Sequence, residues 1–312
     1  MLADCLKTLT AGLVLSAALV ASPALAQDGK KTVGLAVANL QADFFNQIKQ
    51  SVEKEGKAKG VEVVTVDAGG DSATQVSQIQ DLITRNVDAI IYIPAGATAA
   101  SVPVQAAKKA GIPVVAVDRN PPDAPADTFI ATDSVAAAEE LGNFVCKQSG
   151  GKGRLAEIQG QIGTTPQIDR DEGFAKAMKN CAGIQEVAKQ ASNQWAQDEG
   201  FNIAQAMIQR DPEISIFWGQ ADALALGAAQ AAKVGNLSNV IVVGFDGDVA
   251  GLEAVQSGTL TATMTQQTQL MGRLALDSAL KLAAKESVPA TQLQPATLTT
   301  KDNVGPFIEQ HP

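Results

Sequence analysis

The stretch Gly111–Asn120, GIPVVAVDRN, has the pattern of a buried strand that ends in two charged residues. Its central segment VVAV, residues 114–117, contains three β-branched valines and is apolar without polar alternation, as a parallel strand covered on both faces requires. A glycine and a proline precede it and mark its start. Asp118 and Arg119 therefore lie at the carboxyl end of the strand, where open α/β sheets bind their ligands.

The chemistry of this pair suits a polar ligand. A carboxylate accepts hydrogen bonds, and a guanidinium donates them from a planar fork. Side by side at the mouth of a cleft, Asp118 and Arg119 can hold adjacent hydroxyls and a ring oxygen. The structural alternative is a surface ion pair that follows a strand, so the pair has to be judged together with the rest of the chain.

Strands and helices alternate on both sides of this stretch, which predicts an α/β fold with a doubly wound parallel sheet and right-handed crossovers. The expected elements of the first half are strands Thr32–Ala38, Val61–Asp67, Asp88–Pro94, Ile112–Asp118 and Asp127–Ala131, with helices Phe44–Lys59, Ser72–Arg85 and Thr98–Ala110.

The pattern then begins again and predicts a second, similar lobe. Its expected helices are Ser134–Gln148, Asp169–Lys179, Asp198–Gln209, Ala221–Val234 and Val249–Gln256, and its strands are Arg154–Gln159, Ile184–Gln190, Ile214–Trp218 and Val240–Phe245. Strand Leu260–Thr265 and helix Gln269–Ala284 remain, and they can complete the first lobe. The chain would then cross between the lobes more than once, which makes a hinge with a cleft.

The amino-terminal segment 1–26 has the pattern of a secretory signal. Lys7 precedes the apolar run Leu9–Val20, and Ala24-Leu25-Ala26 has the form of a cleavage site. A membrane anchor is the alternative, but the run is shorter than the roughly 20 residues that a span needs. Export with cleavage after Ala26 is expected, and the remaining chain suits two domains.

Composition excludes several classes of function. A net charge of −9 disfavours nucleic-acid binding, which needs a basic surface. The first strand is not followed by a dinucleotide-binding fingerprint, and no P-loop sequence occurs. The single histidine, His311, is expected in a solvated tail, so histidine-based triads and metal sites are not expected. We therefore expect no cofactor, no metal and no enzymatic activity.

Two cysteines, Cys146 and Cys181, follow the predicted signal segment. Their spacing is not that of a metal site. Both fall near the ends of predicted helices that flank strand Arg154–Gln159. A disulfide is plausible in an oxidising compartment, and two separate thiols are the alternative, because spacing alone does not test disulfide geometry.

Six short motifs occur in the order found in a known family, and together they make the chain resemble the periplasmic sugar-binding proteins of the ribose-binding type, which serve ABC importers. The resemblance covers about residues 29–300. The motifs are Phe44-Phe45, Val117-Asp118-Arg119, Gly160 to Thr164 with Arg170-Asp171-Glu172-Gly173-Phe174, Ala223-Leu224-Ala225-Leu226-Gly227-Ala228, Val242-Val243-Gly244-Phe245-Asp246-Gly247 and Ala262-Thr263-Met264-Thr265-Gln266.

The resemblance implies two α/β lobes joined by three hinge segments that close on one small ligand, with residues 27–132 plus 267–290 in the first lobe and 133–266 plus 291–312 in the second. It implies a periplasmic location, a monomer, and delivery of a sugar or polyol to an ABC permease in the inner membrane, with a chemoreceptor as a further partner. The implied ligand-binding residues are Phe44, Phe45, Asp118, Arg119, Arg170, Trp195, Asp246 and Gln266.

Each of these residues also has a structural alternative. The aromatic side chains can pack within a lobe, Arg170 can pair with a neighbouring acid, Asp246 can cap the next helix, and Gln266 can be hinge surface. Phe245 and Trp218 are expected in the core rather than at the ligand.

The chain departs from the family at Ala42 and Ala221, where ribose-binding members carry asparagines that bind hydroxyls. Their loss adds space and removes polar contacts, so we expect these positions to alter specificity and the ligand not to be ribose. The neighbours Gln41, Asp43 and Gln220 can replace the missing amides.

Three other functions are compatible with parts of the sequence to different degrees. A periplasmic sensor that presents its ligand to a chemoreceptor or histidine kinase would use the same residues. A DNA-binding repressor core would need a basic helix-turn-helix in place of the apolar amino-terminal segment. An enzyme with Asp118 and Asp246 as an acid/base pair is disfavoured, because Arg119 favours the ionised form of Asp118.

Overall fold

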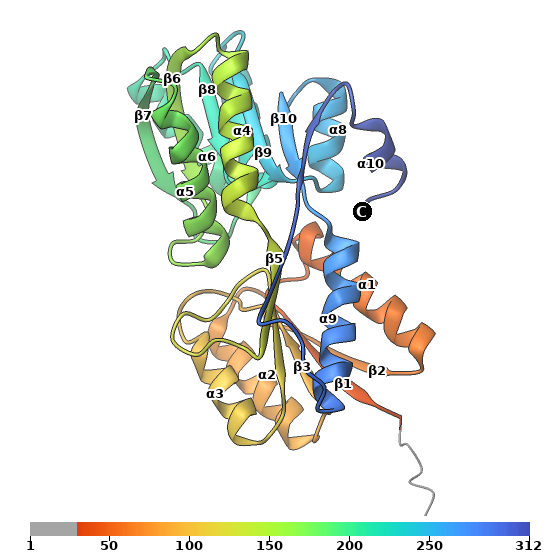
Figure 1. Ribbon diagram of the computed structural model, residues 1–312. Helices are drawn as coiled ribbons and strands as arrows, with labels where there is room; N and C mark the ends of the chain where they lie inside the picture. The colour runs from red at the N-terminus through yellow and green to blue at the C-terminus, as the bar shows by residue number, and fades with distance from the viewer. Residues whose placement is uncertain (1–29) are drawn as a thin grey trace, which may run out of the picture.

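A computed structural model describes residues 30–312, and the predicted signal segment 1–26 lies outside them. The chain forms two α/β lobes, one above the other in Figure 1, and each is built on a six-stranded sheet. This arrangement confirms the predicted fold class. Within residues 30–312, no helix combines the length and the apolarity that a membrane span requires.

The first lobe has an entirely parallel sheet in the order β11-β5-β4-β3-β1-β2. Helices α1 and α9 cover one face, and α2 and α3 cover the other. The elements are β1 (Thr32–Val37), α1 (Asp43–Lys59), β2 (Glu62–Asp67), α2 (Ser72–Thr84), β3 (Ala89–Tyr92), α3 (Ser101–Lys109), β4 (Val114–Val117), β5 (Thr128–Thr132), α9 (Thr268–Ala283) and β11 (Thr291–Gln294).

The second lobe repeats this architecture in the order β12-β10-β9-β8-β6-β7, in which only β12 is antiparallel to its neighbour. Helices α4 and α5 cover one face, and α6, α7, α8 and α10 cover the other. The elements are α4 (Ser134–Gln148), β6 (Lys152–Gln159), α5 (Thr165–Lys179), β7 (Gly183–Ala191), α6 (Gln197–Arg210), β8 (Ile216–Gly219), α7 (Asp222–Val234), β9 (Ile241–Asp246), α8 (Val249–Ser257), β10 (Ala262–Thr265), β12 (Thr297–Thr300) and α10 (Gly305–Glu309).

The described chain crosses between the lobes three times: after β5, after β10, and between β11 and β12. The last crossing corrects the predicted boundary at residue 290, because residues 291–294 pair with β5 of the first lobe. The strands β11 and β12 read TQLQ and TLTT. Such polar edge strands lack the apolar run by which a strand is recognised, and the prediction missed both.

Several helix starts differ from prediction by one to four residues, and two of them bear on the cleft. Helix α5 begins at Thr165 rather than Asp169, with a proline in its first turn, where the missing backbone N–H costs no helical hydrogen bond. Helix α6 begins at Gln197, so Trp195 precedes it in a left-handed conformation with φ of 61°. The loop between β7 and α6 is what presents this tryptophan.

The core supports the predicted packing roles. Every residue of β4 is buried, as its apolar sequence required. Trp218 is fully buried and stacks on Phe174 with ring centroids 5.0 Å apart, and Phe245 is fully buried beside it. Cys146 and Cys181 form a disulfide, with Cα atoms 6.0 Å apart. The bond ties the end of α4 to the segment before β7.

Candidate functional site

A cavity of about 370 Å³ lies between the two lobes, near the lower end of the range of small-molecule sites. Both lobes contribute to its wall, and the loops that follow the strands supply many of the side chains. The lining residues are Asn39, Gln41, Ala42, Asp43, Phe44, Phe45, Asp118, Arg119, Pro166, Arg170, Gln194, Trp195, Ala196, Gln197, Ala221, Ala223, Asp246 and Asp248. Seven of the eight predicted ligand-binding residues are in this set.

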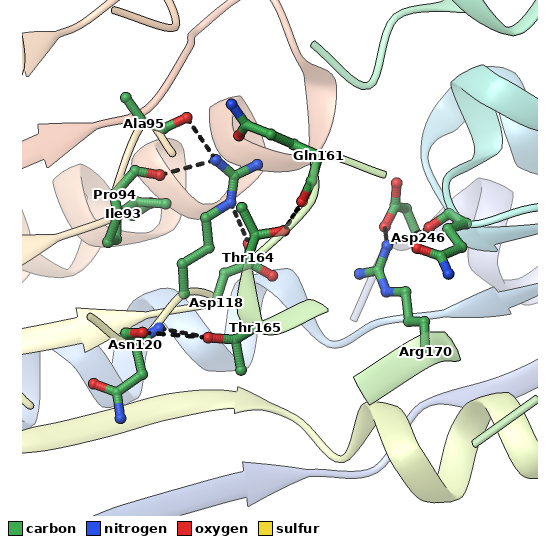
Figure 2. A network of polar contacts seen from close by, with 12 residues as sticks. Ile93, Pro94, Ala95, Asp118, Asn120, Gln161, Thr164, Thr165, Arg170 and Asp246 are labelled. Carbon is green, nitrogen blue, oxygen red and sulfur yellow. Dashed lines mark hydrogen bonds and ion pairs between the residues drawn. The ribbon is translucent and has the colours of Figure 1, made fainter. Parts of the chain in front are cut away.

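In the first lobe, Asp118 and Arg119 lie directly after β4 and are almost fully buried. Arg119 donates from Nη1 to the carbonyl oxygens of Pro94 and Ala95, each at 2.9 Å. Figure 2 labels these two acceptor residues. Its Nε lies 3.5 Å from Oδ2 of Asp118. Burial raises the pKa of Asp118, although Arg119 and Arg170 oppose the shift. The guanidinium is thus fixed against backbone carbonyls beside a buried carboxyl.

In the second lobe, Asp246 ends β9, and Arg170 reaches it from α5. The distance from Nη1 of Arg170 to Oδ1 of Asp246 is 3.3 Å. The guanidinium also lies over the ring of Phe245, with Cζ 4.0 Å from the ring centroid. Burial raises the pKa of Asp246 to about 7, and Arg170 opposes this shift. A second Asp–Arg pair therefore faces the cavity from the opposite lobe.

Aromatic side chains line the cavity between the two pairs. Phe44 and Phe45 begin α1 and meet edge to face, with centroids 5.3 Å apart. Trp195 of the second lobe lies within cation–π range of both arginines, with Cζ of Arg119 at 5.9 Å and Cζ of Arg170 at 5.5 Å from its ring. The cavity thus combines apolar ring surfaces with charged hydrogen-bonding groups.

Backbone strain occurs at three residues of the site. Asp118, Trp195 and Asp246 are non-glycine residues with positive φ values of 63°, 61° and 130°. Such conformations cost on the order of 1–3 kcal/mol each and persist where the surroundings enforce them. Three predicted ligand-binding residues therefore have strained backbones that aim their side chains.

Gln266 does not line the cavity as predicted. It is fully buried at the second crossing, where Nε2 donates to Oδ1 of Asp246 at 2.7 Å and Oε1 accepts from the hydroxyl of Thr132 at 2.5 Å. Its amide therefore holds the carboxyl group of Asp246 from outside the cavity wall. Because Thr132 ends the first-lobe strand β5, the same amide also links the two lobes.

The two positions that depart from the ribose-binding pattern, Ala42 and Ala221, both line the cavity. Gln41 and Asp43, which were considered as replacements for the missing amides, line it too. Gln220 does not: its Nε2 donates to Glu157 and its Oε1 accepts from the N–H of Gly160. Gln220 is committed to contacts within its own lobe.

Sequence reasoning missed the support behind Asp246. Asp222 is fully buried and accepts hydrogen bonds from the N–H groups of Gly247 and Asp248 and from the hydroxyl of Thr263. Asp248, rather than Asp246, caps α8 through the N–H of Gly251. An aspartate directly before a helix is a detectable capping signal. The contacts of Asp222 join separate strands, and the sequence carries no local sign of them.

Among the lining residues, Asn39, Gln194 and Gln197 were not predicted either. They are ordinary loop or helix-start residues in the sequence. His311 also differs from prediction: it is half-buried, with Nε2 2.7 Å from the carbonyl oxygen of Gly247 and Nδ1 3.1 Å from the hydroxyl of Thr268. The histidine joins the start of α9 to the loop after β9. Within residues 30–312, no cluster of acidic, histidine or cysteine side chains is arranged to hold a metal ion.

The lobes also touch directly at the rim of the cleft. The N–H of Asn120 donates to the hydroxyl of Thr165 at 2.9 Å. Figure 2 shows the two residues side by side. At another point the N–H of Val249 donates to Oδ2 of Asp43 at 3.3 Å. These contacts close the two half-sites around the cavity.

Comparisons with known proteins agree with this geometry. Residues 33–287 match the family model described as a periplasmic binding protein domain. A ribose import binding protein of Bacillus subtilis is 32% identical over 270 residues, which are 86% of this chain and 87% of the relative. A xylitol-binding protein of Mycolicibacterium smegmatis is 33% identical over 289 residues, covering 91% and 81% of the two chains.

Among solved structures, an ABC transporter solute-binding protein of Bacillus halodurans with bound myo-inositol superposes with a TM-score of 0.86 at 29% identity. The match covers 92% of this chain and all of the other. The chain belongs to the periplasmic binding protein family. Membership confirms the resemblance drawn from the six motifs, and it confirms that the chain is a binding protein of a transport system rather than an enzyme.

Proposed function

We propose that this protein captures a neutral sugar or polyol in the cleft between its lobes and delivers it to an ABC permease. The observation that carries the proposal is the composition of the cavity wall: one Asp–Arg pair from each lobe, with aromatic rings between them. A sugar has polar edges and apolar C–H faces. Charged planar groups satisfy the edges, and aromatic rings cover the faces.

The charges in the wall favour a neutral ligand. Each arginine already lies beside a carboxylate of its own lobe, and Asp43 and Asp248 add two further acidic groups. A carboxylate or phosphate on the ligand would therefore have to compete with these carboxyl groups for both arginines. Hydroxyl groups can donate to the aspartates and accept from the arginines, which suits both kinds of partner.

In this proposal Phe44, Phe45 and Trp195 cover the faces of the ligand. Asp118 and Asp246 accept from its hydroxyls, while Arg119 and Arg170 donate. The ligand first meets one half-site, and its contacts with the other stabilise the closed arrangement. Gln266 takes part indirectly, through Asp246 and Thr132.

We infer further that the ligand is not ribose. Ala42 and Ala221 offer methyl groups where ribose-binding members carry asparagines, one in each lobe. A hydroxyl that faces them would lose its partner, and each unpaired buried polar group costs about 1–3 kcal/mol. Another pentose, a hexose, a polyol or a sugar with an apolar substituent fits this wall better. The similar proteins include ribose import binding proteins as well as a xylitol-binding protein and a structure with bound myo-inositol, so ligands other than ribose occur among them.

The proposal places the mature protein in the periplasm as a monomer, after export and cleavage behind Ala26. Its partner is a permease of the inner membrane, which would read the two lobe surfaces that closure brings together. A chemoreceptor could read the same surfaces. Support comes from the apolar segment Leu9–Val20 and from the import role of the similar Bacillus subtilis protein.

The test is a ligand screen with ligand-stripped protein. Unfolded protein is dialysed, refolded and titrated calorimetrically with pentoses, hexoses, deoxy sugars, linear and cyclic polyols, and ribose. We expect saturable one-site binding of a neutral sugar or polyol more tightly than ribose. Tight binding of an amino acid or an anionic solute, with no response to carbohydrates, would contradict the proposed function. Tight binding of ribose would contradict only the inference about Ala42 and Ala221.

A further inference from the structure

Gln220 occupies a position at which several parts of the second half-site meet. It lies between β8 and α7 and is fully buried. Its Oε1 accepts from the N–H of Gly160 at 3.0 Å, and its Nε2 donates to Oε1 of Glu157 at 2.8 Å. Its backbone carbonyl accepts from Nη1 of Arg170. One residue therefore fixes both Gly160 and Arg170.

Gly160 is the surface against which Trp195 packs. A Cβ atom built on this glycine would lie 1.8 Å from the indole ring, far inside van der Waals contact. The ring thus packs directly on the backbone of Gly160, so a shift of that backbone would move the ring. Because the side chain of Gln220 accepts from the N–H of Gly160, it holds this backbone in place.

Gly160 and Glu157 together determine which way the amide of Gln220 points. The N–H of Gly160 can only donate, so it takes the amide oxygen of Gln220, and the amide nitrogen then donates to the carboxyl of Glu157, which accepts it. Glu157 is almost fully buried, and its other oxygen lies 3.0 Å from Nζ of Lys189. The ion pair keeps the acceptor in place at the end of the network.

We propose that Gln220, held by Glu157, is a positioning residue of the ligand site, which sets Trp195 through Gly160 and Arg170 through its own carbonyl. The inference rests on the proposed function, since it assigns a role in binding to a residue outside the cavity wall. It predicts that damage to Gln220 disturbs an aromatic and a cationic contact together, although neither side chain is altered.

The variant Gln220→Glu tests this with little change of shape. The new glutamate keeps an oxygen that accepts from the N–H of Gly160. Its second oxygen replaces the amide nitrogen that donated to Glu157, so two carboxyl groups face each other without a hydrogen bond between them. We expect the dissociation constant for the tightest ligand of the screen to rise at least tenfold. In the double variant Glu157→Gln/Gln220→Glu, the amide and the carboxylate exchange places and the hydrogen bond returns. Binding should recover to within about threefold of wild type.

A matched control separates positioning from loss of stability. Asp211→Asn removes the ion pair with Arg154 in the same lobe, away from the cavity wall. It should lower the melting temperature without weakening binding. The fluorescence of ligand-free protein gives a second readout, because the sequence has only two tryptophans and Trp218 is locked in the core. The emission maximum should shift in Gln220→Glu and return in the double variant.

A pH profile adds a signature that a general structural role would not produce. Burial raises the pKa of Glu157 to about 8, and Lys189, Asp171 and Glu186 are the charged groups around it. At low pH, Glu157 and the new carboxyl of Gln220→Glu can share a proton, which restores a donor. The binding defect should therefore be smaller at pH 6 than at pH 8.5.

Two results would overturn the inference. One is a Gln220→Glu protein with wild-type affinity and emission. The other is a double variant that remains as defective as the single one. If wild-type protein binds nothing in the screen, the proposed function fails, and the emission spectra still decide whether Gln220 positions Trp195.

Discussion

The two lobes present similar half-sites that are held in different ways. The first-lobe half-site (Phe44, Phe45, Asp118 and Arg119) and the second-lobe half-site (Arg170, Trp195 and Asp246) each combine aromatic surface, a strand-end aspartate with positive φ, and an arginine. In both, the guanidinium donates to backbone carbonyls. The repeated βα architecture thus places the same kinds of side chain, namely aromatic rings, an aspartate and an arginine, near the carboxyl edge of both sheets.

A buried glutamine supports the arginine in each lobe. In the first, Gln75 donates to the carbonyl of Ile93 and accepts from the N–H of Ala95, beside the carbonyls that receive Arg119. In the second, Gln220 plays the corresponding part for Arg170. The two glutamines differ in their own partners. The amide of Gln75 contacts backbone groups, whereas the amide of Gln220 also donates to a buried carboxyl, that of Glu157. Backbone groups fix the first half-site, whereas titratable groups help to fix the second.

The largest effects are expected when either arginine is removed. Arg119→Ala and Arg170→Ala should each weaken ligand binding at least tenfold, because a buried charged donor is lost and its aspartate is left without a cation. Calorimetric titration measures both. If one variant kept wild-type affinity, the ligand would be held by a single lobe, and the comparison of two half-sites would fail.

The next largest effect concerns the surface beneath Trp195. Gly160→Ala should weaken binding about tenfold, since the added methyl group overlaps the indole ring and forces it from its position. The matched control is Gly305→Ala, where an added Cβ meets no neighbouring atom within 4 Å. Equal affinities for both variants, measured in the same titration, would mean that Trp195 does not contact the ligand.

A change of specificity should follow when the missing amides are restored. The double variant Ala42→Asn/Ala221→Asn should bind ribose about fivefold to tenfold more tightly than wild type and bind its own ligand more weakly, because each amide offers about 0.5–0.7 kcal/mol of net hydrogen bonding. The single variants show which half-site contributes more. An unchanged ratio of the two affinities would contradict the assignment of Ala42 and Ala221 as specificity positions.

The smallest effect is on the pH dependence of stability, and it belongs to the second lobe. Burial raises the pKa of Asp246 to about 7 and that of Glu157 to about 8, both above their values in the unfolded chain. The unfolded chain releases these protons first, so the stabilising contribution is full below about pH 4 and is lost as pH rises through 7 to 8. The melting temperature of ligand-free protein should fall over this interval.

The variants Glu157→Gln and Asp246→Asn should each flatten that fall, whereas the surface variant Lys30→Gln should leave it unchanged. Lys30 is exposed at the start of the described chain, with a long 3.8 Å ion pair to Glu62. Scanning calorimetry at several pH values compares them. A wild-type slope in both buried variants would show that these carboxyls do not carry the pH dependence.

The sequence predicted those parts of the site that follow from local pattern. Asp118 and Arg119 were found because they end an apolar strand, and parallel strands bring such ends to one edge. Residues that act through contacts between separate elements carry no such signal. Gln220 meets Glu157 because β8 lies beside β6, and Asp222 reaches Thr263 of β10 across β9. Strand order determines both contacts, and no motif marks them.

The hinge shows the same limit. Gln266 lies in a recognisable motif, yet its amide is taken up by Asp246 and Thr132, which are far apart in the sequence. His311 was expected in a solvated tail because it is next to the last residue of the sequence. It instead contacts the carbonyl oxygen of Gly247 in the second lobe and the hydroxyl of Thr268 in the first. The partners of a side chain at a crossing depend on which distant segments the fold brings beside it, and the local sequence pattern does not contain this information.

The measurement that tests the central claim most directly is a crystal structure of the protein with the tightest ligand from the screen. The account predicts one ligand between Phe45 and Trp195, with polar atoms within hydrogen-bonding distance of Asp118 or Arg119 from the first lobe and of Arg170 or Asp246 from the second. A ligand that contacts only one lobe, or that lies outside this cavity, would contradict it.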